Sequence, residues 1–179
     1  MTYLFLANGF EELEAVTIID LFRRANIQIK TVSLMDEKGV FGSKGIKIEA
    51  DTLFGHDELM NAQMLILPGG MPGTTNLCNH YEFNQEFKKY AEGDGKIAAI
   101  CAAPMVLAKA GLLKGRKATI YDGMDGELLG AEYTDERIVE DGNIITAKGP
   151  GVAMDFALKL IEILKGEDVM NEVKAGLLY

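Results

Sequence analysis

The chain has 179 residues, with 48% hydrophobic and 25% charged side chains, which is the size and composition of one ordinary globular domain. Its formal net charge of −9 disfavours nucleic acid and anionic membranes as partners, because either needs a basic face. Its apolar runs are too short to span a bilayer, and two cysteines are too few for a disulfide framework. The first apolar run is followed at once by an acidic helix, so we expect no export signal and a cytoplasmic location.

Short apolar runs without polar alternation recur along the chain, separated by segments of helical periodicity. The apolar runs predict strands at Tyr3–Ala7, Ile27–Leu34, Met64–Leu67, Lys96–Ile100, Ala118–Tyr121 and Asn143–Ala147. Helices are predicted at Glu11–Ala25, Tyr81–Glu92, Ala102–Ala110 and Val152–Lys165, and Gly166 follows the last of them as a C-terminal cap. Val40–Lys47 is typical of a glycine-punctuated hairpin, and Thr134–Asp141 of a strand and turn. The pattern predicts one domain over residues 1–179, a doubly wound α/β fold whose mostly parallel sheet has helices on both faces.

Glu14 is an acidic residue in line with the apolar stripe of the first predicted helix, which consists of Ile18, Leu21, Phe22 and Ala25. An ionised carboxylate is costly to bury. Glu14 is therefore expected either to stay protonated, with a raised pKa, or to reach a partner in a cleft. The alternative is a half-exposed acid that complements the helix dipole, which is the role we expect for Glu11 and Glu12.

The strand Met64–Leu67 runs into a glycine-rich loop that begins Pro68-Gly69-Gly70. In open α/β sheets, ligands bind at the carboxyl ends of the strands. Gly69 and Gly70 permit close approach of the backbone and can direct amide N–H groups toward an oxyanion. No Gly-Lys-Ser/Thr follows, so this is not a phosphate-binding loop. A second edge loop, Lys148-Gly149-Pro150-Gly151, is explained equally well as a plain helix entry.

The strand Lys96–Ile100 ends at Cys101, and a helix-like segment follows. Strand, cysteine and helix are the order of a nucleophile elbow, in which the positions two before and two after the nucleophile must be small. Ala99 and Ala103 meet that demand. The dipole of the following helix favours a thiolate, so we expect a low pKa for Cys101 and an idle or structural role for Cys78. A buried structural cysteine at a strand end explains this segment equally well.

Both histidines, His56 and His80, precede Cys101. A cysteine hydrolase of the amidotransferase type has its histidine base after the nucleophile, so that chemistry is disfavoured. We expect His80 to begin a surface helix and His56 to lie in a loop. Neither forms a convincing ligand cluster with Cys78, so the sequence predicts no metal site and no cofactor.

Four motifs in order resemble the ThiJ/PfpI superfamily, over essentially the whole chain, and are closest to the branch of the parkinsonism-associated protein deglycase and its bacterial relatives. They are Gly9-Phe10-Glu11-Glu12-Leu13-Glu14, Leu67-Pro68-Gly69-Gly70, Ala99-Ile100-Cys101-Ala102-Ala103-Pro104 and Lys148-Gly149-Pro150-Gly151 with Asp155-Phe156-Ala157-Leu158. The resemblance implies a flavodoxin-like sandwich and a homodimer. It also implies that Cys101 is the reactive cysteine and that Glu14 is a protonated acid bonded to its sulfur. Gly70 and Ala102 would supply backbone N–H groups to an oxyanion or to an oxidised sulfur.

Two departures from the superfamily matter. The protease-like branch has a histidine directly after the nucleophile, where this chain has Ala102, so peptidase activity is not expected. The deglycase branch often has a histidine near the cysteine, where this chain has Tyr121. A phenol donates a hydrogen bond but is a poor base near neutral pH, which leaves Glu14 as the main candidate for proton transfer. Lys148 and Lys44 align loosely with basic residues of the family.

Two functions fit these residues. The first is a cofactor-independent glyoxalase or deglycase, a lyase or hydrolase that acts on methylglyoxal or glycated adducts and protects from carbonyl and oxidative stress. In it Cys101 adds to the aldehyde, Glu14 shuttles a proton and the backbone amides stabilise the oxyanion. The second is a redox sensor in which peroxide oxidises Cys101 to sulfinate; a chaperone-like dimer has no direct support in the sequence.

A homodimer is also expected from the first predicted helix. Leu13, Val16 and Ile19 add apolar surface beyond the stripe that faces the sheet. One sheet contact does not need this surplus, which therefore indicates a subunit interface.

Overall fold

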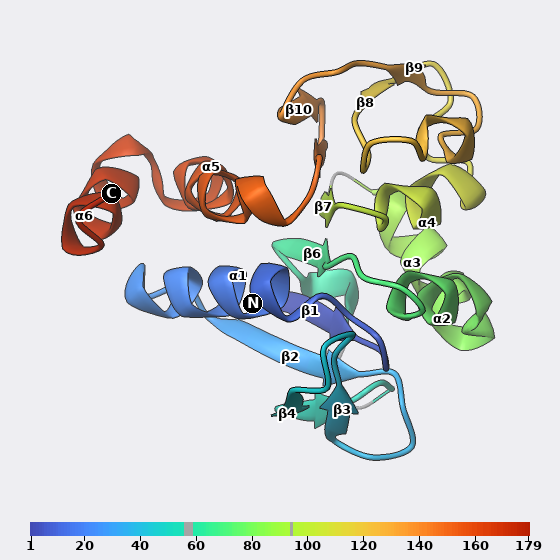
Figure 1. The fold of residues 1–179 in the computed structure, drawn as a ribbon, viewed down its shortest axis with the longest axis horizontal. Helices are drawn as coiled ribbons and strands as arrows, with labels where there is room; N and C mark the ends of the chain where they lie inside the picture. The colour runs from blue at the N-terminus through green and yellow to red at the C-terminus, as the bar shows by residue number, and fades with distance from the viewer. Residues whose placement is uncertain (56–58, 94) are drawn as a thin grey trace.

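Seven strands form the central sheet of the computed structural model, which describes residues 1–55, 59–93 and 95–179 (Figure 1). The strand order is β10-β11-β7-β6-β1-β2-β5, and only β10 runs antiparallel to its neighbour. These strands are β1 (Thr2–Leu6), β2 (Ile29–Ser33), β5 (Thr52–Leu53), β6 (Met64–Leu67), β7 (Lys96–Ile100), β10 (Ile138–Asp141) and β11 (Ile144–Ala147). The five longer parallel strands have the order of a flavodoxin-like doubly wound sheet, as predicted.

Helices cover both faces of this sheet, as predicted (Figure 1). They are α1 (Glu12–Arg24), α2 (Gly73–Asn79), α3 (Tyr81–Ala91), α4 (Pro104–Lys109), α5 (Ala153–Lys165) and α6 (Glu167–Gly176). Short 3-10 turns occur at Leu59–Asn61, Asp125–Glu127 and Pro150–Val152. Helices α1, α5 and α6 pack on one face, and α2, α3 and α4 pack on the other. Among the described residues, no helix is long and apolar enough to cross a membrane.

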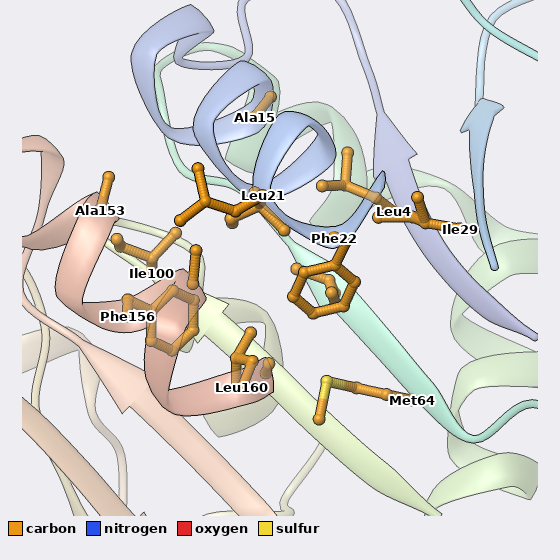
Figure 2. Packing of buried hydrophobic residues seen from close by; sticks show 14 of the residues in the cluster. Leu4, Ala15, Leu21, Phe22, Ile29, Met64, Ile100, Ala153, Phe156 and Leu160 are labelled. Atoms are coloured by element: carbon orange, nitrogen blue, oxygen red, sulfur yellow. The ribbon is translucent and has the colours of Figure 1, made fainter. Parts of the chain in front are cut away.

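Two apolar cores follow from the alternation of side chains along the strands. On β1, Leu4 and Leu6 belong to the core beneath α1 and α5, whereas Tyr3 and Phe5 belong to the core beneath α2, α3 and α4. Figure 2 shows the first of these cores, where Phe22 of α1 and Phe156 of α5 lie against the sheet. Because both faces are covered, an inner strand such as β6 is apolar throughout, which is the pattern that predicted it.

One predicted strand, Ala118–Tyr121, does not belong to the central sheet. Only Lys117–Ala118 (β8) is extended, and it pairs with Glu132–Tyr133 (β9) in a separate two-stranded sheet. The next amide, of Thr119, donates to the side-chain Oγ1 of Thr146 at 3.0 Å instead of joining a ladder. The predicted hairpin is confirmed as β3 (Gly39–Phe41) and β4 (Lys47–Glu49), which pair antiparallel.

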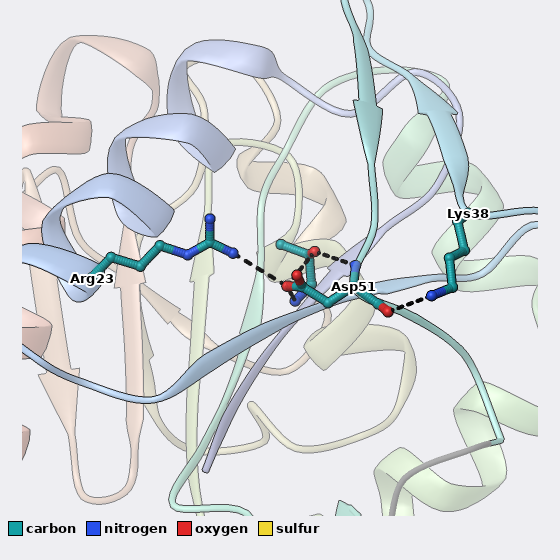
Figure 3. Close-up of polar contacts among 4 residues, drawn as sticks. Arg23, Lys38 and Asp51 are labelled. Atoms are coloured by element: carbon teal, nitrogen blue, oxygen red, sulfur yellow. Dashed lines mark hydrogen bonds and ion pairs between the residues drawn. The ribbon is translucent and has the colours of Figure 1, made fainter.

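Asp51 fastens the segment between β4 and β5 to the edge of β2 (Figure 3). Its carboxylate Oδ2 accepts hydrogen bonds from the N–H of Thr31 at 2.8 Å and from its hydroxyl at 2.9 Å, and Arg23 approaches the same oxygen at 3.3 Å. Lys38 donates to the Asp51 carbonyl oxygen at 2.7 Å. Thr31 is buried, so its amide depends on this carboxylate for an acceptor.

Asp51→Ala is expected to lower the free energy of unfolding by about 1 to 3 kcal/mol, because it leaves a buried amide without an acceptor. Asp20→Ala is the matched control, since it removes an ion pair to Arg24 in which both side chains are 50% exposed. The control is expected to change stability by less than about 0.5 kcal/mol. Urea denaturation of the two variants measures the difference, and equal losses would show that the buried amide does not depend on Asp51.

Candidate active site

The candidate site lies where the strand order reverses. In the sheet, β2 lies on one side of β1, whereas β6 and β7 lie on its other side. The carboxyl ends of the strands at such a reversal are the usual ligand-binding position in open α/β sheets. Cys101 directly follows β7, Gly69 follows β6, and Glu14 is in the first turn of the helix that follows β1. The structure thus brings together three residues that the sequence singled out separately.

Cys101 has the strained backbone of a nucleophile elbow. Its φ is 64°, in the left-handed region that non-glycine residues rarely adopt. Its N–H donates to the carbonyl of Ala147 at 2.9 Å, and its own carbonyl accepts from the N–H of Tyr121 at 2.9 Å. These two bonds hold the turn between β11 and the segment after β8. The side chain is buried, with 8% of the residue exposed.

Glu14 is completely buried beside this cysteine. Its Oε2 accepts a hydrogen bond of 2.8 Å from the N–H of Gly69. Its Oε1 is buried and has no partner in hydrogen-bonding geometry among the described residues. The Cys101 thiol also interacts with the carboxyl, and the nearby charge of Glu11 adds to the rise of its pKa. The structure therefore confirms that Glu14 lies in the interior next to a partner and is not a solvated first-turn acid.

The two loop glycines make this approach possible. A Cβ on Gly69 would lie 2.5 Å from the Cβ of Cys101 and 2.9 Å from Oε2 of Glu14. Gly70 has a φ of 89°, and its N–H, like that of Ala102, is directed at the sulfur of Cys101. Both N–H groups lower the pKa of the thiol, because donors to the charged form of a group favour it.

Burial and proximity shift the pKa values of both acids. Burial raises the pKa of Glu14 to about 7, even though the Gly69 amide and the thiol favour its ionised form. While Glu14 is ionised, burial together with the charge and hydrogen bond of its carboxylate raises the pKa of the Cys101 thiol to about 12, against the two backbone N–H groups. The pair therefore loses one proton near pH 7 and holds the second proton far into the alkaline range, as coupled acids do.

The helix dipole does not set the pKa of Cys101. Helix α4 begins only at Pro104 and spans six residues, so its dipole is small and starts three positions after the thiol. Burial and Glu14 decide the direction of the shift instead. The expectation for the second cysteine holds in direction, because burial also raises the pKa of Cys78.

The raised pKa of Glu14 predicts that the free energy of unfolding depends on pH. The folded pair binds its proton up to about pH 7, whereas an unfolded glutamate releases it near 4.5. The contribution of Glu14 to the free energy of unfolding is therefore fully present below about pH 4.5 and is lost as the pH rises to about 7. Relative to Glu14→Gln, the wild type is expected to lose about 3 kcal/mol of unfolding free energy over this interval. Parallel pH profiles in denaturant titrations of the two proteins would contradict the shift.

Tyr121 and Lys148 line a cavity of about 210 Å³ beside the cysteine, together with Asp122 and residues 149–152. Gly149 separates this cavity from the sulfur, since a Cβ there would lie 3.9 Å from Sγ of Cys101 and 3.1 Å from the Tyr121 ring. Tyr121 is 49% exposed. Both residues thus lie near Cys101, and the edge loop that begins at Lys148 also leads into α5 through the 3-10 turn Pro150–Val152.

Other candidates lie elsewhere. The Lys44 N–H donates to Oε1 of Glu12 at 2.7 Å on the β3–β4 hairpin, and Glu12 is buried there instead of half-exposed. His80 begins α3 as predicted, and its side chain accepts from the N–H of Phe83. His56 lies outside the described residues.

Sequence reasoning missed Asp135. Its carboxylate pairs with the ammonium of Lys148, which also pairs with Asp122 at 2.8 Å. No local pattern marks this residue, because the contact joins two loops that are 13 residues apart.

Comparison with known proteins agrees with this geometry. The profile of the DJ-1/PfpI family matches residues 2–163. Protein dj-1beta of Drosophila melanogaster is 38% identical, over 97% of this chain and 94% of that protein. Glutathione-independent glyoxalase DJR-1.2 of Caenorhabditis elegans is 32% identical, over 91% of this chain and 87% of that protein. The chain spans 37% of the longer Protein DJ-1 homolog B of Arabidopsis thaliana.

The fold is also similar to solved structures. Oxidised DJ-1 of Toxoplasma gondii superposes with a TM-score of 0.94 at 35% identity, covering 99% of this chain and 97% of that one. Profile, relatives and fold agree with one another. The chain belongs to the DJ-1/PfpI family, in its DJ-1 branch.

Proposed function

We propose that this protein is a cofactor-independent glyoxalase that converts small 2-oxoaldehydes such as methylglyoxal into hydroxy acids. The observation that carries the proposal is the buried Cys101–Glu14 pair, which holds one ionisable proton near neutral pH beside two backbone donors. A relative that is named a glyoxalase, at 32% identity, supports the same assignment.

In the reactive form, the single proton of the pair lies on Glu14 and Cys101 is the thiolate. The sulfur has two backbone N–H donors, from Gly70 and Ala102, whereas Oε2 of Glu14 has the Gly69 amide alone. Donors to the charged form favour it. If Oε1 of Glu14 carries the proton, it can donate a hydrogen bond to the sulfur. Unprotonated, the same oxygen is a buried acceptor without a donor among the described residues.

The chemistry begins when the Cys101 thiolate adds to the aldehyde carbon of methylglyoxal and forms a hemithioacetal. The aldehyde oxygen becomes an oxyanion, which the amides of Gly70 and Ala102 stabilise until it takes a proton. That proton comes from Glu14, and the resulting Glu14 carboxylate then removes the proton from this carbon and returns it to the neighbouring ketone carbon through an enediol, which leaves a lactoyl thioester on the sulfur. Water hydrolyses the thioester to lactate and regenerates Cys101. The net reaction adds one water to methylglyoxal and needs no external oxidant.

A glycated amine or thiol is a second form of the same substrate. Once its carbonyl-derived part is transferred to Cys101, the amine or thiol leaves, and the remaining steps are unchanged. The deglycase activity is therefore an extension of the glyoxalase chemistry and uses the same residues.

Lactate production from methylglyoxal tests the proposal, with Cys101→Ser as the control. We expect the wild type to form lactate catalytically and the Cys101→Ser variant to form it at the background rate. A second sample is treated with peroxide and weighed as the intact protein. A gain of two oxygens on Cys101 without any lactate turnover would reject the enzyme in favour of a redox sensor.

A homodimer is also proposed. Leu13 and Val16 are 53% and 47% exposed on α1, and such apolar surface is typical of a subunit interface. Ile19 packs partly against the core instead, so it does not contribute to the surplus. We expect light scattering to give twice the chain mass at micromolar concentration and Leu13→Glu to shift the protein toward monomer. A monomeric wild type would reject the proposal.

A further inference from the structure

Lys148 is held between two carboxylates at the mouth of the cavity beside Cys101. Its ammonium pairs with Asp122 at 2.8 Å and with Asp135, and the Tyr133 hydroxyl donates to the same Asp135 carboxylate at 3.1 Å. The lysine side chain is 21% exposed, whereas the two aspartate side chains are 77% and 81% exposed. The carboxylates therefore face the solvent, and the cation lies behind them.

The charges at this mouth do not balance. One ammonium offsets one of the two carboxylates, and a net negative charge remains. The hydrogen bonds with Asp122 and Asp135 raise the pKa of Lys148, and its hydrogen bond lowers the pKa of Asp135. Lys148 and Asp135 are consequently both charged at neutral pH.

This charge lies beside the nucleophile. Asp122 adjoins Tyr121, whose N–H bonds the carbonyl of Cys101, and Lys148 adjoins Gly149, which borders Sγ. Asp122, Lys148 and Gly149 line one cavity. An incoming molecule on this side meets the exposed carboxylates before it meets the lysine, so an anion is repelled and a neutral molecule is not.

We propose that Asp122 and Asp135 act as a charge filter that admits neutral carbonyl compounds to Cys101 and disfavours those bearing a carboxylate or phosphate. The inference rests on the proposed function for its substrate class, which becomes neutral 2-oxoaldehydes such as methylglyoxal, with glyoxylate as a disfavoured counterpart. Lys148 is not an anion-binding residue in this arrangement, because both carboxylates already occupy it.

Alkylation of Cys101 by iodoacetamide and by iodoacetate tests the filter without any turnover. The two reagents are similar in size and differ in charge, so the ratio of their rates cancels the ionisation state of the thiol. Rates are measured at Cys101 by peptide mapping. In Asp122→Asn/Asp135→Asn, the iodoacetate-to-iodoacetamide ratio is expected to rise about threefold to tenfold at low salt.

Glu86→Gln/Glu162→Gln is the matched control, because it removes two lysine-paired carboxylates from α3 and α5. It is expected to leave the ratio within about twofold of wild type, since these charges lie on helices away from the cavity mouth. In the wild type, about 0.5 M NaCl is expected to raise the ratio by screening the carboxylates.

An unchanged ratio in the aspartate variant, an equal rise in the control, or no effect of salt on the wild type would each overturn the filter. Because alkylation needs no catalysis, these outcomes are independent of lactate formation. A protein that forms lactate but shows no charge discrimination loses only this inference, and one that discriminates without forming lactate loses only the proposed function.

Discussion

Glu14→Gln is expected to slow lactate formation from methylglyoxal by about a hundredfold or more, the usual scale for loss of a general acid–base. Glutamine keeps the shape of the side chain and can still accept the Gly69 hydrogen bond, which is 2.8 Å long in the wild type. It also keeps a donor for the Cys101 sulfur but cannot transfer a proton between substrate carbons. Oxidation of Cys101 to sulfinate by peroxide is therefore expected to persist in this variant.

Glu14→Leu separates the two roles of the side chain, because it removes both the transferable proton and the hydrogen bond to the sulfur. We expect this variant to lose lactate formation and also to resist oxidation, since its thiolate has lost a donor. Steady-state lactate assays and intact masses after peroxide treatment distinguish the variants. Wild-type activity in Glu14→Leu would remove Glu14 from the mechanism.

Gly69→Ala is expected to disrupt the site by steric overlap alone. Its Cβ would lie 2.5 Å from the Cβ of Cys101 and 2.9 Å from the Ile100 carbonyl oxygen, which is closer than real Cβ contacts allow. Cys101 and Glu14 must then move apart, and backbone shifts in a packed core cost about 1 to 3 kcal/mol. Displacing catalytic groups by about 1 Å costs about a hundredfold in rate, so we expect both losses together.

Gly126→Ala is the control for Gly69→Ala, because a Cβ on Gly126 meets nothing within 4 Å. It is expected to leave lactate formation unchanged and stability within about 0.5 kcal/mol of the wild type. Urea denaturation and lactate assays on both variants make the comparison. Equal behaviour of the two alanine variants would show that the close approach at Gly69 is not required.

The central sheet is predictable from the sequence because its strands are buried on both faces. Met64–Leu67 is a continuous apolar run, Lys96–Ile100 is apolar after its first residue, and the structure forms β6 and β7 with those bounds. Helix α1 is predictable for the complementary reason, since its apolar stripe follows helical spacing. Buried positions that recur at a regular interval produce an apolar pattern that a single sequence shows.

The elements absent from the prediction have weak local signals. Helix α2 begins Gly73-Thr74-Thr75-Asn76, which are poor helix formers, and it is stabilised by packing. Helix α6 has Val173 as its one buried residue among those described, so its apolar pattern is slight. Strand β5 has two residues and depends on β2 for its pairing.

At the site, residues that break a local rule are predictable and long-range contacts are not. Glu14 on an apolar stripe and Cys101 at an elbow are anomalies that the sequence shows. The direction of the thiol pKa is different, because it depends on burial beside a carboxylate from another element. The same holds for Asp135, whose partner Lys148 is reached only through the arrangement of loops.

The ultraviolet absorbance of the Cys101 thiolate, followed against pH as the difference between wild type and Cys101→Ser, tests most directly whether the pair works as proposed. The pair loses its first proton near pH 7, and we place the resulting charge on the sulfur. The expected result is one thiolate per chain that appears with a midpoint near that pH. Absence of a Cys101-dependent signal below about pH 10 would place the charge on Glu14 and contradict the proposed nucleophile.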